Sequence, residues 1–131
     1  MPQLRLALAQ VNATVGDLAG NADLVVEHCK ASVEQGVHLI VFPEMMLTGY
    51  PLEDLAMRLS LIRASQAAIQ VLARRLQDEG CGDLVAMVGY LDQMPDVIDA
   101  PGIPKNAPQN CVAIIHDGKI VARQAKHHLW N

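Results

Sequence analysis

Aromatic residues are scarce in this chain of 131 residues, where they make up 3% of the sequence as one tryptophan, two tyrosines and one phenylalanine. Aliphatic side chains therefore have to fill the interior. With 51% hydrophobic and 18% charged residues, the composition favours one folded domain and excludes a disordered chain. Excess positive charge is also lacking, since the formal net charge is −4. Neither nucleic acid nor an anionic membrane is therefore expected as a partner.

Several other features are missing. No apolar run approaches the roughly 18 residues that cross a bilayer, and the alternating start MPQLRLALAQV is unlike a signal peptide. The cysteines Cys29, Cys81 and Cys111 form no CxxC pair, which favours a reduced, cytoplasmic compartment. The adjacent His127 and His128 would point to opposite faces of a strand, so no metal site is expected. The patterns GxxxxGK[ST] and GxGxxG are absent, so no cofactor is expected in these residues.

The periodicity of the apolar residues predicts alternating strands and helices. Strands are expected over residues 4–11, 38–42 and 84–90, helices over 22–35 and 60–77, and loops over 43–58 and 92–110. Asn21 or Asp17 is expected to cap the first helix. Asp117 and Gly118 predict a hairpin between residues 110–116 and 119–125. The run 38–42 is continuously apolar, which predicts a strand covered on both faces.

This order of elements predicts an α/β fold. Two strand–helix–strand units imply a mixed sheet with its helices on one side. No second helical layer is visible in residues 1–131. The other face of the sheet is therefore expected to be covered by another sheet or by another copy of the chain.

Two charged residues follow predicted strands, at the ends where α/β sheets bind ligands. Glu44 comes two residues after the apolar run HLIVF, and the apolar residues that follow it predict a partly buried carboxylate with a raised pKa. Such a group suits a general base. Lys126 follows the second hairpin strand and is suited to holding an oxyanion. The alternatives are a solvated loop glutamate and a surface lysine, which are the commoner roles of these residue types.

Three segments resemble the nitrilase, or carbon–nitrogen hydrolase, superfamily. VHLIVFPEMMLTGYPLEDL is similar to its glutamate motif, LRLALAQVNATVGDLAGN to its first strand and loop, and GKIVARQAKHHL to its lysine motif. The extension LTGYPLEDL resembles the glutaminase domain of glutamine-dependent NAD synthetases. The resemblance implies an α-β-β-α four-layer sandwich, incomplete here, with residues 1–131 as the N-terminal part of one glutaminase domain.

The resemblance also implies a Glu–Lys–Cys mechanism that hydrolyses glutamine. Glu44 would be the general base, Lys126 would hold the oxyanion, and Tyr50 would line the glutamine pocket. The implied partners are a synthetase domain, which would bind ATP and a dinucleotide, and further copies of the chain. The nucleophile has no counterpart: Cys29 and Cys111 are expected in the core, and Cys81 precedes its strand. Trp130 also stands where the lysine motif has proline.

Two other functions stay open at this point. A stand-alone carbon–nitrogen hydrolase acting on an amide, a nitrile or an N-carbamoyl compound would share Glu44 and Lys126. A catalytically inactive association module would use an exposed apolar sheet face instead.

Overall fold

The computed structural model of the chain describes residues 3–52, 58–93 and 107–126. Within these ranges it has five strands and two helices, in the order β1 (Leu6–Leu8), α1 (Leu18–Glu34), β2 (Leu39–Val41), α2 (Leu59–Asp78), β3 (Val85–Gln93), β4 (Pro108–His116) and β5 (Lys119–Ala125). Neither helix in this part of the chain combines the length and apolar character needed to cross a membrane.

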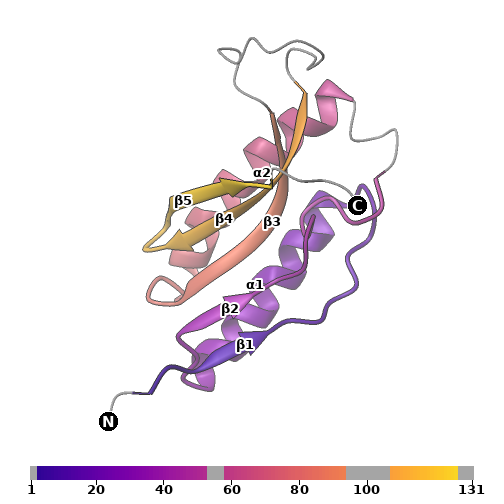
Figure 1. Ribbon diagram of the computed structural model, residues 1–131. Helices are drawn as coiled ribbons and strands as arrows, with labels where there is room; N and C mark the ends of the chain where they lie inside the picture. The colour runs from indigo at the N-terminus through magenta and orange to yellow at the C-terminus, as the bar shows by residue number, and fades with distance from the viewer. Residues whose placement is uncertain (1–2, 53–57, 94–106, 127–131) are drawn as a thin grey trace.

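The strands form one mixed sheet in the order β1-β2-β3-β4-β5 (Figure 1). β1, β2 and β3 are parallel, whereas β4 pairs antiparallel with β3, and β5 pairs antiparallel with β4. Right-handed crossovers place α1 and α2 on the same face of the sheet, where they pack against each other. The predicted mixed sheet with one helical layer and a terminal hairpin is confirmed.

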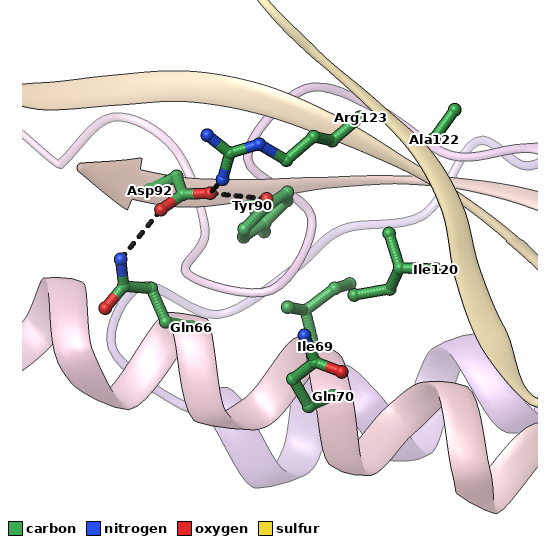
Figure 2. A pocket seen from close by; sticks show the side chains of 8 residues that line it. All are labelled: Gln66, Ile69, Gln70, Tyr90, Asp92, Ile120, Ala122 and Arg123. Atoms are coloured by element: carbon green, nitrogen blue, oxygen red, sulfur yellow. Dashed lines mark hydrogen bonds and ion pairs between the residues drawn. The ribbon is translucent and has the colours of Figure 1, made fainter. Parts of the chain in front are cut away.

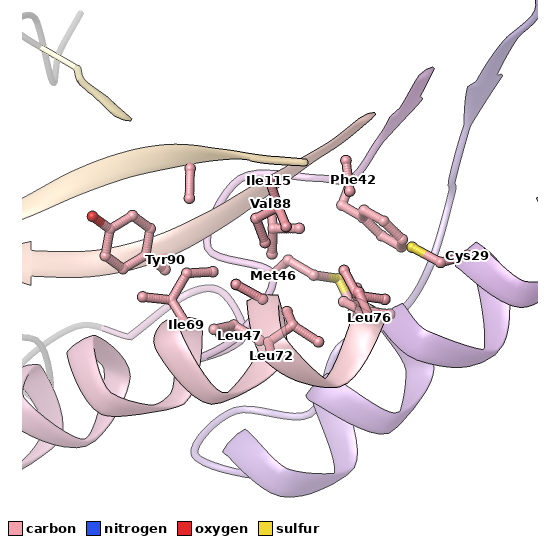
Figure 3. Close-up of a cluster of buried hydrophobic side chains, with 14 of the residues drawn as sticks. Cys29, Phe42, Met46, Leu47, Ile69, Leu72, Leu76, Val88, Tyr90 and Ile115 are labelled. Atoms are coloured by element: carbon pink, nitrogen blue, oxygen red, sulfur yellow. The ribbon is translucent and has the colours of Figure 1, made fainter. Parts of the chain in front are cut away.

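The core lies between the helices and this face of the sheet. Figure 3 shows buried side chains from both helices, from β3 and β4, and from the segment after β2 meeting in one cluster. Met46 and Leu47 belong to this cluster. The segment that carries Glu44 is therefore anchored in the interior by its neighbours.

The first strand and the start of the first helix differ from the prediction. β1 covers only Leu6–Leu8, and α1 begins at Leu18 rather than at residue 22. The cap of α1 is Asp17, whose Oδ1 accepts from the Gly20 amide at 3.0 Å. Asn21 is not a cap, because it lies inside the helix and is buried.

The face of the sheet away from the helices is largely open. Ile40 is buried, whereas its β2 neighbours Leu39 and Val41 are half-buried, so the described residues cover β2 on the helical face only, and the predicted cover of its other face stays a prediction. On β1, Leu6 and Leu8 are 57% and 76% exposed. We call the sheet face away from the helices the uncovered face.

The predicted loop 92–110 was too long at both ends. β3 continues to Gln93 and β4 begins at Pro108, because the antiparallel ladder extends to the pairs Asp92–Gln109 and Gln93–Pro108. Asp92 and Asn110 therefore occupy regular strand positions. Residues 94–106 lie outside the described ranges.

Candidate active site

The segment after β2, residues 43–49, is here called the glutamate loop. Two backbone hydrogen bonds hold this region to β3: the Phe42 amide donates to the Met87 carbonyl at 3.0 Å, and the Leu47 amide donates to the Gly89 carbonyl at 3.1 Å. Glu44 lies between these two attachments. Its backbone is therefore fixed against the centre of the sheet.

Gly89 makes this close approach possible. A Cβ atom at this position would lie 2.5 Å from the Met45 nitrogen and 2.8 Å from the Pro43 oxygen, closer than real side-chain contacts allow. Sequence reasoning missed Gly89, although a glycine inside an apolar strand is a known signal of close backbone approach.

Asn21 fastens the other side of the glutamate loop. Its amide donates to the carbonyls of Leu47 and Thr14 at 2.9 and 2.8 Å, and its Oδ1 accepts from the Thr14 amide at 2.8 Å. The Gly16 amide also donates to the Thr48 carbonyl at 2.8 Å. α1 therefore ties the loop after β1 to the loop that carries Glu44.

Lys126 reaches Glu44 from the opposite part of the sheet. Two antiparallel pairings give β5 the same direction as β2 and β3, so the carboxyl ends of β2 and β5 face the same edge. The Lys126 amide donates to the Asn110 carbonyl at 2.9 Å, which continues the β4–β5 ladder. Its Nζ atom then lies 2.7 Å from Oε1 of Glu44, as a hydrogen-bonded ion pair.

This ion pair is open to solvent. The side chains of Lys126 and Glu44 are 47% and 56% exposed. The partial burial expected for Glu44 was therefore wrong, because Met46 and Leu47 turn into the core while the carboxylate does not. The Glu44 carboxylate is thus solvent-exposed but lies in direct contact with the Lys126 ammonium.

Two adjoining pockets meet at the pair. One of about 350 Å³ is bounded by Gly89, by Glu44 and Lys126, and by the ends of β4 and β5. The other, of about 220 Å³, is lined by Tyr50 together with Glu44 and Lys126. Tyr50 is 70% exposed, so its ring is accessible to a ligand.

Asn110 lines both pockets, and it is a site residue that sequence reasoning missed. The sequence predicts it at the junction of the loop 92–110 and the strand 110–116, with no role in the site. Its strand pairing with Leu91 instead holds its amide group beside Glu44 and Lys126, where it can serve as a neutral donor or acceptor for a polar substrate.

None of the cysteines is suited to act as a nucleophile. All three are free and buried. Burial raises the pKa of Cys29 to about 12 and that of Cys111 to about 11, and burial also raises the pKa of Cys81. Activated thiols have depressed pKa values and accessible sulfur atoms. Cys111 borders the larger pocket but remains a buried, protonated thiol near neutral pH.

The described site thus offers a carboxylate, an ammonium group and a neighbouring amide at a pair of open pockets. These groups can accept a proton and stabilise an oxyanion. His127, His128 and Trp130 lie outside the described residues.

The chain was compared with known proteins. It is 34% identical over 131 residues to the glutamine-dependent NAD(+) synthetase of Thermotoga maritima, covering 100% of this chain and 20% of that protein. It is 33% identical over 127 residues to the enzyme of the same name from Rhodobacter capsulatus, covering 97% and 20%. The chain therefore spans about a fifth of the length of these curated relatives.

Solved structures agree with this relationship. The glutamine-dependent NAD+ synthetase of Acinetobacter baumannii superposes with a TM-score of 0.77 at 28% identity, covering 98% of this chain and 22% of that one. An amidase from Nesterenkonia sp. shares the fold, with a TM-score of 0.66 at 23% identity, over 98% of this chain and 44% of that one. The family model for carbon-nitrogen hydrolases matches residues 5–131, and the chain belongs to this family.

Proposed function

We propose that residues 1–131 form the N-terminal part of the glutaminase domain of a glutamine-dependent NAD synthetase. The contact of 2.7 Å between Lys126 and Glu44 carries this proposal. It joins two groups that acyl-transfer chemistry needs, at the edge of two pockets. The names of the relatives from Thermotoga maritima and Rhodobacter capsulatus support glutamine as the substrate.

In the proposed mechanism Glu44 is the general base. It takes the proton of a cysteine thiol as the sulfur attacks the side-chain amide carbon of glutamine. The carbonyl oxygen becomes an oxyanion, which the Lys126 ammonium stabilises. Collapse of the tetrahedral intermediate leaves a thioester and expels ammonia, which receives its third hydrogen from protonated Glu44. Glu44 then deprotonates water, which hydrolyses the thioester to glutamate and restores the thiol.

The nucleophile in this mechanism is not Cys29, Cys81 or Cys111, because all three are buried and have raised pKa values. We assign it to the protein beyond Asn131. The same continuation would supply a synthetase domain that binds ATP and a dinucleotide and uses the released ammonia. Tyr50, at the rim of the smaller pocket, is proposed to contact the glutamine.

Ammonia release from glutamine tests the proposal. The protein extended through its natural continuation should hydrolyse glutamine, whereas the chain of 131 residues should not. Hydrolysis of simple amides or nitriles without any hydrolysis of glutamine would favour a stand-alone carbon–nitrogen hydrolase instead. Thiol-dependent turnover by the 131-residue chain would contradict the assignment of the nucleophile to residues beyond Asn131.

The uncovered face favours a second role, that of an association surface. Leu6 and Leu8 of β1 are more than half exposed on this face, and exposed apolar groups on a sheet face are usually covered in the functional protein. We propose that the chain works in the cytoplasm as part of a homo-oligomer. Light scattering of the purified chain tests its association, and a monomer at all concentrations would contradict it.

A further inference from the structure

A buried carboxylate lies on the helical side of the sheet, away from Glu44. Asp92, near the end of β3, is 4% exposed. It accepts hydrogen bonds from the Tyr90 hydroxyl at 2.5 Å, from Gln66 Nε2 at 2.7 Å and from the Gln93 amide at 2.7 Å. The Arg123 guanidinium completes the set as an ion pair. Figure 2 shows Gln66, Tyr90 and Arg123 converging on this one carboxylate.

These contacts hold Asp92 in its charged form. Burial alone would raise the pKa of Asp92, but the hydrogen bonds from Gln66, Tyr90 and Gln93 and the charge of Arg123 outweigh burial, and the pKa lies below its ordinary value. Burial, together with the neighbouring Asp92, raises the pKa of Tyr90, so its hydroxyl stays a donor. Removing the charged partner of a buried carboxylate strongly destabilises the folded state, because an uncompensated charge stays buried. Conformations in which Arg123 reaches Asp92 are therefore favoured over those in which it does not.

The ion pair connects strands that are not neighbours. Arg123 belongs to β5 and Asp92 to β3, with β4 between them. The β4 residues in register with Arg123 and Tyr90 are Ala113 and Cys111, and their small side chains leave room for the guanidinium to cross. The Asp92–Arg123 pair is thus a link across three strands, in addition to the backbone ladder.

β5 starts at the two-residue turn Asp117–Gly118, which fixes its first pairs, His116–Lys119 and Ile115–Ile120. In the described residues it pairs on one edge only, with β4, and the ladder is irregular between Ile114 and Ile115. Most of its side chains are exposed. A pocket of about 340 Å³ separates part of β5 from α2 at Ile69 and Gln70, so packing does not fill the space beside it (Figure 2). The turn fixes the register of β5 only up to the irregularity in the ladder, so the residues that follow it, 122–125, depend on other contacts for their register.

The position of β5 matters because Lys126 follows Arg123 by three residues. At about 3.3 Å per strand residue, a one-residue slip of β5 would remove the Lys126 ammonium from Glu44 and turn its side chain to the other face. We propose that the Asp92–Arg123 pair, supported by Tyr90 and Gln66, is a positioning device that holds β5 in the register at which Lys126 meets Glu44. The catalytic importance of this role rests on the proposed function. The placement of Lys126 beside Glu44 can be measured without any catalytic activity.

The test compares two arginine variants of the chain. Arg123→Met keeps an unbranched apolar side chain and removes the guanidinium with its charge. Arg75→Met is the control, because Arg75 also forms ion pairs, with Asp23 and Glu79 at 2.6 and 2.8 Å, but on the helical surface and away from β5. The readout is the nuclear Overhauser effect between the Lys126 Hε and Glu44 Hγ protons, with the amide shifts of β3 and β4 as the measure of folding.

Arg123→Met should weaken this Overhauser effect by roughly twofold or more, with the β3 and β4 shifts retained, as expected for loss of register in an edge strand. Arg75→Met should leave it unchanged. A full-strength effect in folded Arg123→Met would overturn the inference. If Arg123→Met does not fold, Arg123→Gln, which leaves an amide donor near Asp92, is judged by the same criterion.

Unfolding of both Arg123 variants would mean that the residue stabilises the whole sheet rather than placing Lys126, and this result would also overturn the inference. The proposed function is tested separately. The Lys126–Glu44 contact can be lost in Arg123→Met while the wild-type extended protein fails to hydrolyse glutamine. In that case the positioning role stands and the glutaminase assignment does not.

Discussion

The Nζ atom of Lys126 lies 2.7 Å from Oε1 of Glu44, although 82 positions of sequence separate the two residues. Two independent anchors create this contact. One is the glutamate loop, which is attached to β3 and α1. The other is β5, whose direction returns its carboxyl end to the edge where β2 ends.

Gly89→Ala should displace the glutamate loop. The added methyl group would collide with backbone atoms of Met45 and Pro43, and overpacking of this kind costs about 1–3 kcal/mol of unfolding free energy. The contact between Glu44 and Lys126 should also be lost. Urea unfolding and the Lys126–Glu44 Overhauser effect measure the two consequences.

Gly36→Ala is the control for this variant. Gly36 has a φ of +71° and meets only the Arg5 side chain, at 3.5 Å, so alanine should cost about 1 kcal/mol through backbone strain. The Lys126–Glu44 contact should survive in Gly36→Ala. If it disappears in both variants, general destabilisation explains the loss and the role assigned to Gly89 is wrong.

Asn21→Ala should loosen the glutamate loop from α1. The change removes three hydrogen bonds and leaves the Leu47 carbonyl without its partner, at a cost of about 2 kcal/mol. The loss should appear as a lower urea midpoint. Asn12→Ala, at an exposed position, should change the stability by less than about 0.5 kcal/mol. Equal stabilities of the two variants would contradict the role of Asn21.

How far the sequence predicts this site differs from residue to residue. Glu44 and Lys126 follow strands recognisable from their apolar patterns, so the sequence alone predicts both at strand ends where α/β sheets bind ligands. Asn21 was considered a cap because polar residues before helices usually are, but its buried hydrogen bonds come from loops distant in sequence. Asp92 and Asn110 stand at the two ends of the predicted proline-bearing loop, Asn110 also as the first residue of the predicted strand 110–116, and neither position indicated a contact. The β3–β4 ladder, a tertiary interaction, extends the strands to include both.

The three thiols should react slowly with an aromatic disulfide reagent at pH 8. Burial raises the pKa of Cys29 to about 12 and that of Cys111 to about 11, so few thiolate anions are present at this pH in the folded chain. Three equivalents should react once urea unfolds it, since the sequence holds three free cysteines. One thiol that reacts rapidly in the folded chain would reveal an accessible sulfur and reopen the search for a nucleophile among these residues.

The most direct test of the account is the steady-state kinetics of glutamine hydrolysis by the extended protein carrying Glu44→Gln or Lys126→Met. Removing the base should lower kcat roughly 10²–10⁴-fold, and removing the oxyanion donor should lower it roughly 10²–10³-fold. The controls, Glu27→Gln on α1 and Lys119→Met at the far end of β5, change exposed residues and should leave kcat unaltered. Wild-type kcat in either Glu44→Gln or Lys126→Met would contradict the claim that this pair forms part of the catalytic site.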